Sequence, residues 1–93
     1  MLKSFKSKET EKIFQRSFSR KLPQAIQKTA YRRLVLLHSA RELKDLLLPP
    51  ANCLERLQGD RLGQHSIRIN DQWRICFIWQ DGDVYEVEIV DYH

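Results

Sequence analysis

The spacing of apolar residues changes near the middle of the chain, and this change limits the folds that the sequence can adopt. Between residues 8 and 40, apolar side chains recur every three or four positions, which is the period of one helix face. From residue 54 onward, apolar and polar side chains alternate, as they do along a strand. The sequence therefore predicts an α+β fold in which helices are followed by strands.

Two helices are predicted in the first half of the chain. Ser7 is a good N-cap for a first helix over residues 8–18, and Pro23 suits the first position of a second helix that runs to residue 40. A short helical turn over 41–48 would precede the prolines at 49 and 50. The apolar stripe of the first helix would contain Ile13, Phe14 and Phe18. The stripe of the second helix would contain Ile26, Ala30, Leu34 and Leu37.

The second half is predicted to form an antiparallel meander. Its candidate strands cover residues 54–57, 65–69, 73–79 and 84–90. Asn70-Asp71 and Asp81-Gly82 are predicted as two-residue hairpin connections, and a brief edge strand over 2–5 would add a fifth strand. The expected fold therefore has two N-terminal helices packed on one face of a four- to five-stranded, mainly antiparallel, twisted sheet, with the other face available to a ligand.

Size and composition favour one domain over residues 1–93, because a chain of 93 residues builds one modest core. No apolar run approaches the roughly 20 residues of a membrane-spanning helix, and the first residues do not resemble a secretory signal. We therefore expect a cytoplasmic protein. Cys53 and Cys76 have no metal-ligand spacing, so no metal or cofactor is expected. Cys76 is predicted to be buried, and Cys53 to be a free thiol in a loop.

Charge is distributed unevenly along the chain, whose net charge is +4. Through Arg61 there are 14 Lys and Arg against 6 Asp and Glu, giving +8, whereas the remaining residues carry 2 against 6, giving −4. A basic region of this strength attracts nucleic acid through phosphate contacts. A solvated basic face on amphipathic helices would have the same composition. The candidate RNA and ribosome contacts are Lys28, Arg32, Arg33, Arg56, Arg61 and Arg68.

Several motifs of the chain are similar to those of a known protein family. They are Lys3-Ser4-Phe5, Leu57-Gln58-Gly59-Asp60-Arg61, the segment from Gly63 to Ile75, and Asp91-Tyr92-His93. In this order they resemble the HigB family of the RelE/ParE toxin superfamily. The resemblance implies a ribosome-dependent mRNA endonuclease of a type II toxin-antitoxin system. It also implies a helix-turn-helix, HigA-like antitoxin as partner, with operator DNA contacted only through the antitoxin complex.

The resemblance further implies that Asp91, Tyr92 and His93 take part in cleavage. Metal-free RNA cleavage requires deprotonation of the 2′-hydroxyl, stabilisation of phosphorane charge and protonation of the leaving 5′-oxygen. His93 is the expected general acid, because an imidazole exchanges protons near neutral pH. Tyr92 would stack on a base or hydrogen-bond a phosphate, and Asp91 would orient His93 or act as the base.

Gln58 departs from the family pattern, because HigB proteins have a lysine at this position. A lysine would place positive charge near the scissile phosphate, whereas a glutamine donates only a neutral hydrogen bond. Arg74 is the first candidate to replace the lost charge, because alternation directs it away from the apolar face of its strand. Arg56, Arg61 and Arg68 are the further candidates. Without such a replacement the protein would be a weaker nuclease.

Strict alternation along the last strand separates the three terminal candidates. It places Asp91 and His93 on one face with Tyr85, Val87 and Ile89, and Tyr92 on the other. A bulge in the strand would reconcile these positions. Two functional alternatives also remain at this point: a ParE-like toxin that acts on DNA gyrase, and a module that binds ribosome or antitoxin without cleaving RNA.

Overall fold

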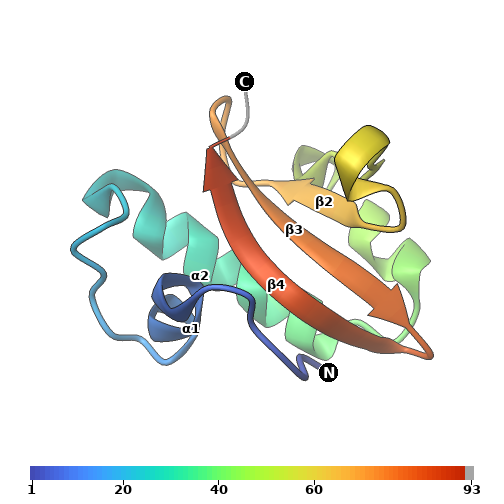
Figure 1. Ribbon diagram of the computed structural model, residues 1–93, viewed down its shortest axis with the longest axis horizontal. Coiled ribbons are helices and arrows are strands. Elements are labelled where there is room, and N and C mark those ends of the chain that lie inside the picture. Colours follow the sequence, from blue (N-terminus) through green and yellow to red (C-terminus); the bar gives the residue numbers. More distant parts are fainter. Residues whose placement is uncertain (92–93) are drawn as a thin grey trace.

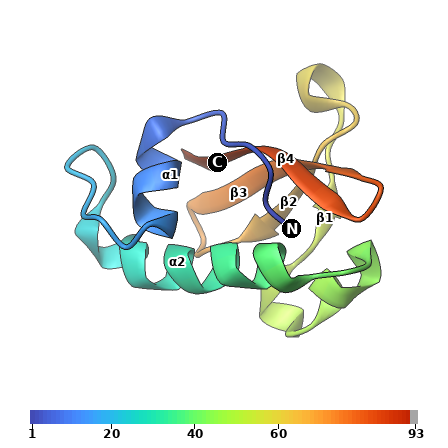
Figure 2. The same ribbon diagram turned by 90° about the horizontal axis from the view of Figure 1, so that it is seen from below.

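A computed structural model of the chain describes residues 1–91, so that Tyr92 and His93 lie outside the described residues. The helices are α1 (Lys8–Phe14) and α2 (Gln24–Ser39), and three short 3-10 helices follow as η1 (Leu43–Leu47), η2 (Pro50–Asn52) and η3 (Gly59–Arg61). The strands are β1 (Glu55–Arg56), β2 (His65–Arg68), β3 (Trp73–Gln80) and β4 (Asp83–Asp91). They form one antiparallel sheet in the order β1-β2-β3-β4, with α2 across one face and α1 packed against α2 and the outer edge of β4 (Figure 1, Figure 2). The predicted α+β arrangement is confirmed.

The first helix begins as predicted but ends early. Ser7 Oγ accepts a hydrogen bond from the Thr10 backbone N–H at 3.3 Å, which satisfies a donor that the first turn leaves free. The helix ends at Phe14 because Arg16 adopts a left-handed conformation with φ of 63°. Phe18 therefore lies in the following loop with 60% of its surface exposed. The prediction that Phe18 belongs to a helix ending at residue 18 is wrong.

The second helix carries the predicted core stripe. Its four buried apolar residues are Ile26, Ala30, Leu34 and Leu37. They share one core with Ile13 of α1 and with residues of the sheet. The sheet residues include Ile75 and Phe77 of β3 and Val84 and Val87 of β4. Burial of each large aliphatic side chain contributes about 1.5–3 kcal/mol, so α2 holds the sheet from one side. Pro23 serves as the N-cap, one position before its predicted place.

The two hairpin connections differ in length. Asp81 and Gly82 have φ values of 52° and 82°, which suit a two-residue turn with left-handed backbone, as predicted. The β2–β3 connection covers the four residues 69–72 instead of two. Asn70 lengthens it, because its Oδ1 accepts hydrogen bonds from the backbone N–H groups of Gln72 at 2.9 Å and Trp73 at 2.8 Å.

The N-terminal segment and a bulge complete the sheet. Leu2 and Phe5 make isolated parallel bridges to Val84 and Val87, so residues 2–5 line the outer edge of β4 as the predicted brief edge strand. A register shift between Cys76 and Ile78 lies opposite Glu86, whose φ is 53°. Tyr85 consequently faces away from Val87, which corrects the strict alternation expected for β4. Within residues 1–91 no helix is both long and apolar enough to cross a membrane.

Candidate active site

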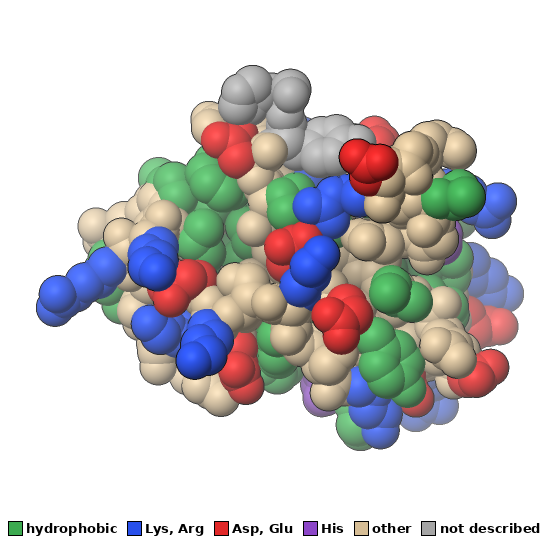
Figure 3. Space-filling view, viewed as in Figure 1, with side chains coloured by type: hydrophobic (Ala, Val, Ile, Leu, Met, Phe, Trp, Pro, Cys, Tyr) green, Lys and Arg blue, Asp and Glu red, His purple; other side chains and the backbone are tan. Residues whose placement is uncertain are grey.

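The face of the sheet opposite the helices, here called the open face, is polar. One row across the four strands pairs Glu55 with Ser66, Ser66 with Cys76, and Cys76 with Glu88. A second row on the same face pairs Arg68 with Arg74, and Arg74 with Val90. Cationic and acidic side chains lie side by side over the middle of the surface that faces the viewer (Figure 3). The sheet therefore has charged side chains on the face that α2 leaves free, although Ser66, Arg74 and Cys76 in its middle are buried.

Arg74 is the buried cation of the open face. Only 8% of the surface of Arg74 is exposed. The Nε–H group donates to Ser66 Oγ at 2.7 Å, and Nη2 donates to the Ser66 carbonyl at 3.3 Å and to the Cys53 carbonyl. Nη1 lies 3.8 Å from Glu55 Oε1. The predicted direction of Arg74 is confirmed, and its contacts attach the segment before β1 to the sheet while fixing a positive charge on this face.

A second cluster links η3 to β4 across the open face. Arg61 Nη1 donates to Glu88 Oε1 at 2.9 Å and to Gln64 Oε1 at 3.1 Å, and Lys6 Nζ lies 3.8 Å from the same Glu88 oxygen. The Cys76 thiol is buried, and burial raises its pKa above the ordinary value, so it stays protonated at neutral pH. Arg61 was predicted as a possible RNA contact and as a further candidate to replace the lost lysine charge, and in the structure it also stabilises the packing of η3.

Asp91 is the last described residue and lies at the end of β4. It pairs with Trp73 of β3, and its Oδ2 accepts a hydrogen bond from Gln72 Nε2 at 3.1 Å. The expectation that the final strand runs directly into Asp91 is confirmed. The preceding residue, Val90, pairs with Arg74 on the open face. Asp91 is therefore one position beyond the row of Arg68 and Arg74, and its side chain is on the opposite side of the sheet. The predicted catalytic residues Tyr92 and His93 lie outside the described residues.

The predicted basic contacts do not form one continuous patch. Arg68 forms an ion pair with Asp71 on the open face. Lys28 and Arg32 are exposed on α2, which covers the other face of the sheet. Arg33 is half-buried and its Nε–H donates to the Arg68 carbonyl at 3.1 Å. Arg56 of β1 is also exposed. The candidates therefore divide between two sides of the molecule.

Gln58 lies apart from Asp91 along the strand direction. It is exposed and caps the start of η3, where its carbonyl accepts a hydrogen bond from the Arg61 N–H at 3.2 Å. The ladder from β1 continues with the Leu57 N–H donating to the Gln64 carbonyl at 2.9 Å. Gln58 therefore lies near the start of β2. Asp91 lies near the opposite end of β2, beside the β2–β3 loop.

His65 is a half-buried histidine that the sequence left without a role. Its ring stacks on Phe77 with centroids 6.1 Å apart, and its Nδ1 is buried with no hydrogen-bond partner within residues 1–91. Burial, with the positive charge of Arg56, lowers the pKa of His65. Cys53 is exposed and unpaired by any disulfide, as predicted. Over the same 91 residues, no group of three or more His, Cys, Asp or Glu side chains could hold a metal ion.

The residues that sequence reasoning missed are the partners of the arginines. Ser66 and Glu55 hold Arg74, and Glu88 holds Arg61. Once the β2–β3 hairpin is assumed, its register places Ser66 on the face of Arg74, so this partner could have been found. The Cys53 carbonyl carries no side-chain signal and could not.

A family model matches almost the whole chain. The model for HigB-like toxins, described as the RelE-like toxin of the type II toxin-antitoxin system HigB, matches residues 3–93. The chain belongs to the HigB-like toxin family. The match covers the motifs quoted from the sequence and confirms the resemblance that they indicated.

Other members of the HigB-like family align over most of the chain. Toxin HigB-1 of Vibrio cholerae is 37% identical over 83 residues, covering 88% of this chain and 87% of the relative. Endoribonuclease HigB of Proteus vulgaris is 33% identical over 93 residues, covering 100% of both chains. The second alignment therefore includes all strands of the open face.

Solved structures with the same fold confirm the RelE-like architecture of this HigB-like toxin. A heterotetrameric YoeB-YefM toxin-antitoxin complex from Staphylococcus aureus contains a chain that superposes with a TM-score of 0.61 at 23% identity, covering 100% of this chain and 98% of that one. A second YoeB-YefM complex from the same organism gives a TM-score of 0.56 at 20% identity, with the same coverage. At these identities the likeness concerns the fold alone.

Proposed function

We propose that this HigB-like toxin is an endoribonuclease that cleaves translated mRNA on the ribosome, with Asp91, Tyr92 and His93 as its active site. The relative from Proteus vulgaris that aligns over its full length is named an endoribonuclease. The structural observation that supports the site is the end of β4. Its pairing continues to Asp91, which Trp73 and Gln72 hold. The sheet therefore fixes the backbone up to the residue that precedes Tyr92.

The proposed chemistry is an attack by the 2′-oxygen on the adjacent phosphorus. The bond from phosphorus to the 5′-oxygen breaks, and His93 donates the proton that this oxygen needs. An imidazole has an ordinary pKa of about 6.5, so both of its protonation states are populated near neutral pH. Asp91 accepts the proton that the 2′-hydroxyl loses, or it orients His93 while a water molecule accepts that proton. Tyr92 stacks on a base or hydrogen-bonds a phosphate. The proposal needs no metal and no cofactor.

Arg74 and Arg68 are the cations best placed to replace the missing lysine. Arg74 contributes a fixed charge, because its described donors are already bound to Ser66 and Cys53. Arg68 lies in the same row, and its partner Asp71 has 98% of its side chain exposed. Such an exposed ion pair is weak, so Arg68 can exchange Asp71 for an RNA phosphate. We therefore propose that Arg68 contacts the RNA phosphate directly. Arg74 contributes a fixed positive charge nearby.

The proposed partners are an antitoxin and the ribosome. Membership in a family of type II toxins supports an antitoxin partner, and the related Staphylococcus aureus structures are toxin-antitoxin complexes. We propose a HigA-like, helix-turn-helix antitoxin through which the toxin reaches operator DNA. The exposed cations Lys28 and Arg32 of α2 are proposed ribosome contacts. A ribosome-bound target makes the cytoplasm the place of action.

The test compares one transcript with and without its start codon, in a purified translation system that contains the chain. Primer extension should find cuts inside codons of the translated transcript and none in the untranslated one. A supercoiling assay with DNA gyrase, run in parallel, should show no inhibition. Gyrase inhibition without RNA cuts would favour a ParE-like toxin, and ribosome binding without cuts would favour a binding module. Either result would overturn the proposal.

A further inference from the structure

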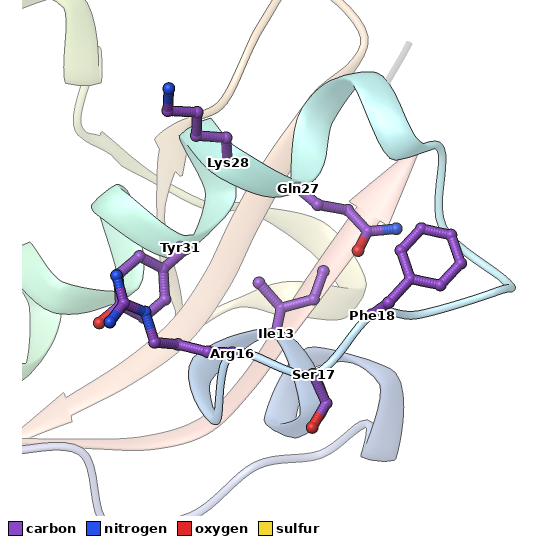
Figure 4. Close-up of a pocket in the computed structure, with 7 residues that line it drawn as sticks. All are labelled: Ile13, Arg16, Ser17, Phe18, Gln27, Lys28 and Tyr31. Carbon is purple, nitrogen blue, oxygen red and sulfur yellow. The ribbon is translucent and has the colours of Figure 1, made fainter.

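A pocket of about 300 Å³ lies between the end of α1 and the first half of α2. Ile13 lies in its centre, Phe18 on one side, and Tyr31 on the other (Figure 4). The Arg16 guanidinium covers the Tyr31 ring, with its carbon 5.0 Å from the ring centroid. Lys28 stands on the rim with its ammonium group directed outward. The pocket therefore has an apolar floor between two flat walls.

The early end of α1 creates one of these walls. Because Arg16 is left-handed, the chain leaves the helix before Phe18, and 60% of the Phe18 surface stays exposed. A phenylalanine ring in this position forgoes the burial that most phenylalanines gain in a core. A ligand that covers the ring would recover it.

The surroundings of the pocket are mainly basic, although the carboxylate of Glu9, which binds Ser19 and Lys12, lies nearby. Residues 12–41 contain eight Lys and Arg and no Asp or Glu. Within the part of the chain that the structure describes, neither Arg16 nor Lys28 forms an ion pair with a carboxylate. Two unpaired cations beside apolar walls match a ligand that combines an apolar group with negative charge on either side.

We propose that this pocket takes the base of one unpaired ribosomal RNA nucleotide, which stacks on Phe18 while its flanking phosphates contact Arg16 and Lys28. The inference rests on the proposed ribosomal function and adds a docking site to it. Base stacking on an aromatic ring is tolerant of sequence and needs no polar partner. The pocket also lies on the helix side of the sheet, away from the open face where messenger RNA is proposed to bind, so ribosomal RNA is the source that fits.

The hydrogen-bonding groups of the pocket favour a base over an acidic peptide. The Gln27 side chain is occupied, because its Oε1 accepts from the Ser19 N–H at 3.2 Å and its Nε2 donates to the carbonyls of Ser19 at 2.8 Å and Leu22 at 2.9 Å. The walls come from two helices and a loop and not from a sheet edge, so an extended peptide would find no strand to pair with. A planar base that lies between Phe18 and Tyr31 needs neither a free amide side chain nor a strand edge.

The decisive experiment measures co-sedimentation of the chain with vacant ribosomes, in the His93→Ala background so that RNA stays intact. The further change Phe18→Ala should weaken ribosome binding about tenfold, the scale of one lost base stack. Phe18→Trp in its place should bind ribosomes as tightly as the chain with Phe18. Leu62→Ala is the matched control, because Leu62 is also exposed, at 73%, and lies in the loop after η3. Circular dichroism should be the same for all variants.

Competitors then identify the kind of partner. A single-stranded oligouridylate should displace ribosomes from the chain with Phe18, and about tenfold less well from the Phe18→Ala variant. Polyglutamate should displace both equally, through charge alone. Unchanged ribosome affinity of Phe18→Ala would overturn the proposal, and so would a Phe18-dependent effect of polyglutamate, which would indicate an acidic peptide partner. These binding results do not depend on cleavage, so a chain that binds through Phe18 but never cuts RNA would refute only the nuclease.

Discussion

Replacement of Arg74 by methionine should destabilise the fold strongly, although the two side chains are similar in length. The variant loses the hydrogen bonds to Ser66 and to the Cys53 carbonyl, in a site where the Arg74 side chain is only 9% exposed. Hydrogen bonds from charged groups contribute about 1.5–3 kcal/mol each, but the losses are not additive. We therefore expect the free energy of unfolding to fall by about 3 kcal/mol. For a domain of this size, Tm would drop by about 12–24 °C.

Urea unfolding followed by circular dichroism measures this change. Arg56→Met is the matched control, because Arg56 is an exposed cation on the neighbouring strand and its loss should change stability by less than about 0.5 kcal/mol. Arg74→Lys should fall between the two, since a lysine keeps the charge but cannot reach several acceptors at once. An Arg74→Met variant as stable as the control would refute the structural role assigned to this arginine.

Three further perturbations address the charge and the pH response of the molecule. Gln58→Lys should raise codon-site cleavage by about tenfold if missing charge limits the rate, and an unchanged rate would show that the arginines already supply it. Lys28→Glu with Arg32→Glu should weaken ribosome co-sedimentation and flatten its dependence on salt, whereas an identical salt series would exclude α2 from the interface. The pKa of His65 is below its ordinary value of 6.5 in the folded chain, so the unfolded chain binds this proton more readily. The free energy of unfolding should therefore fall as pH drops through 6.5 and level off below the folded pKa. His65→Gln should abolish that part of the slope in urea titrations, and an unaltered slope would assign it elsewhere.

Residues whose side chains have strong local preferences were placed correctly from sequence. Ser7 caps α1, and the spacing of Leu34 and Leu37 predicts the buried face of α2. Asp81 and Gly82 predict a tight turn, since glycine and aspartate tolerate left-handed backbone better than most residues. In each case the determining interactions lie within a few positions of the residue. The α+β fold follows from these local signals.

The errors arose where the backbone departs from the local preference. Arg16 is left-handed without being a glycine or asparagine, so nothing in the sequence indicates that α1 ends before Phe18. Glu86 forms a bulge in a segment that alternates regularly, and the side chain of Tyr85 changes face as a result. Both features depend on packing between elements distant in the sequence, which a periodicity argument does not contain.

The candidate site was predictable in part. Alternation was enough to direct Arg74 to the open face, because Trp73 and Ile75 on either side of it are apolar. Its burial was not predictable, since one acceptor is the carbonyl of Cys53, 21 positions earlier in the chain. The pocket beside Phe18 was missed for the same reason that the helix end was missed. Local patterns show where a side chain points, while long-range contacts decide what it meets.

The most direct test of the proposed active site is primer extension on a single mRNA that purified ribosomes translate in the presence of the chain or its His93→Ala variant. The unmodified chain should produce cuts within codons. The variant should produce about 10²-fold fewer, the scale of general acid catalysis, while its melting temperature and antitoxin binding stay unchanged. A His93→Ala variant that cuts translated mRNA as fast as the unmodified chain would contradict the assignment of cleavage to the end of β4.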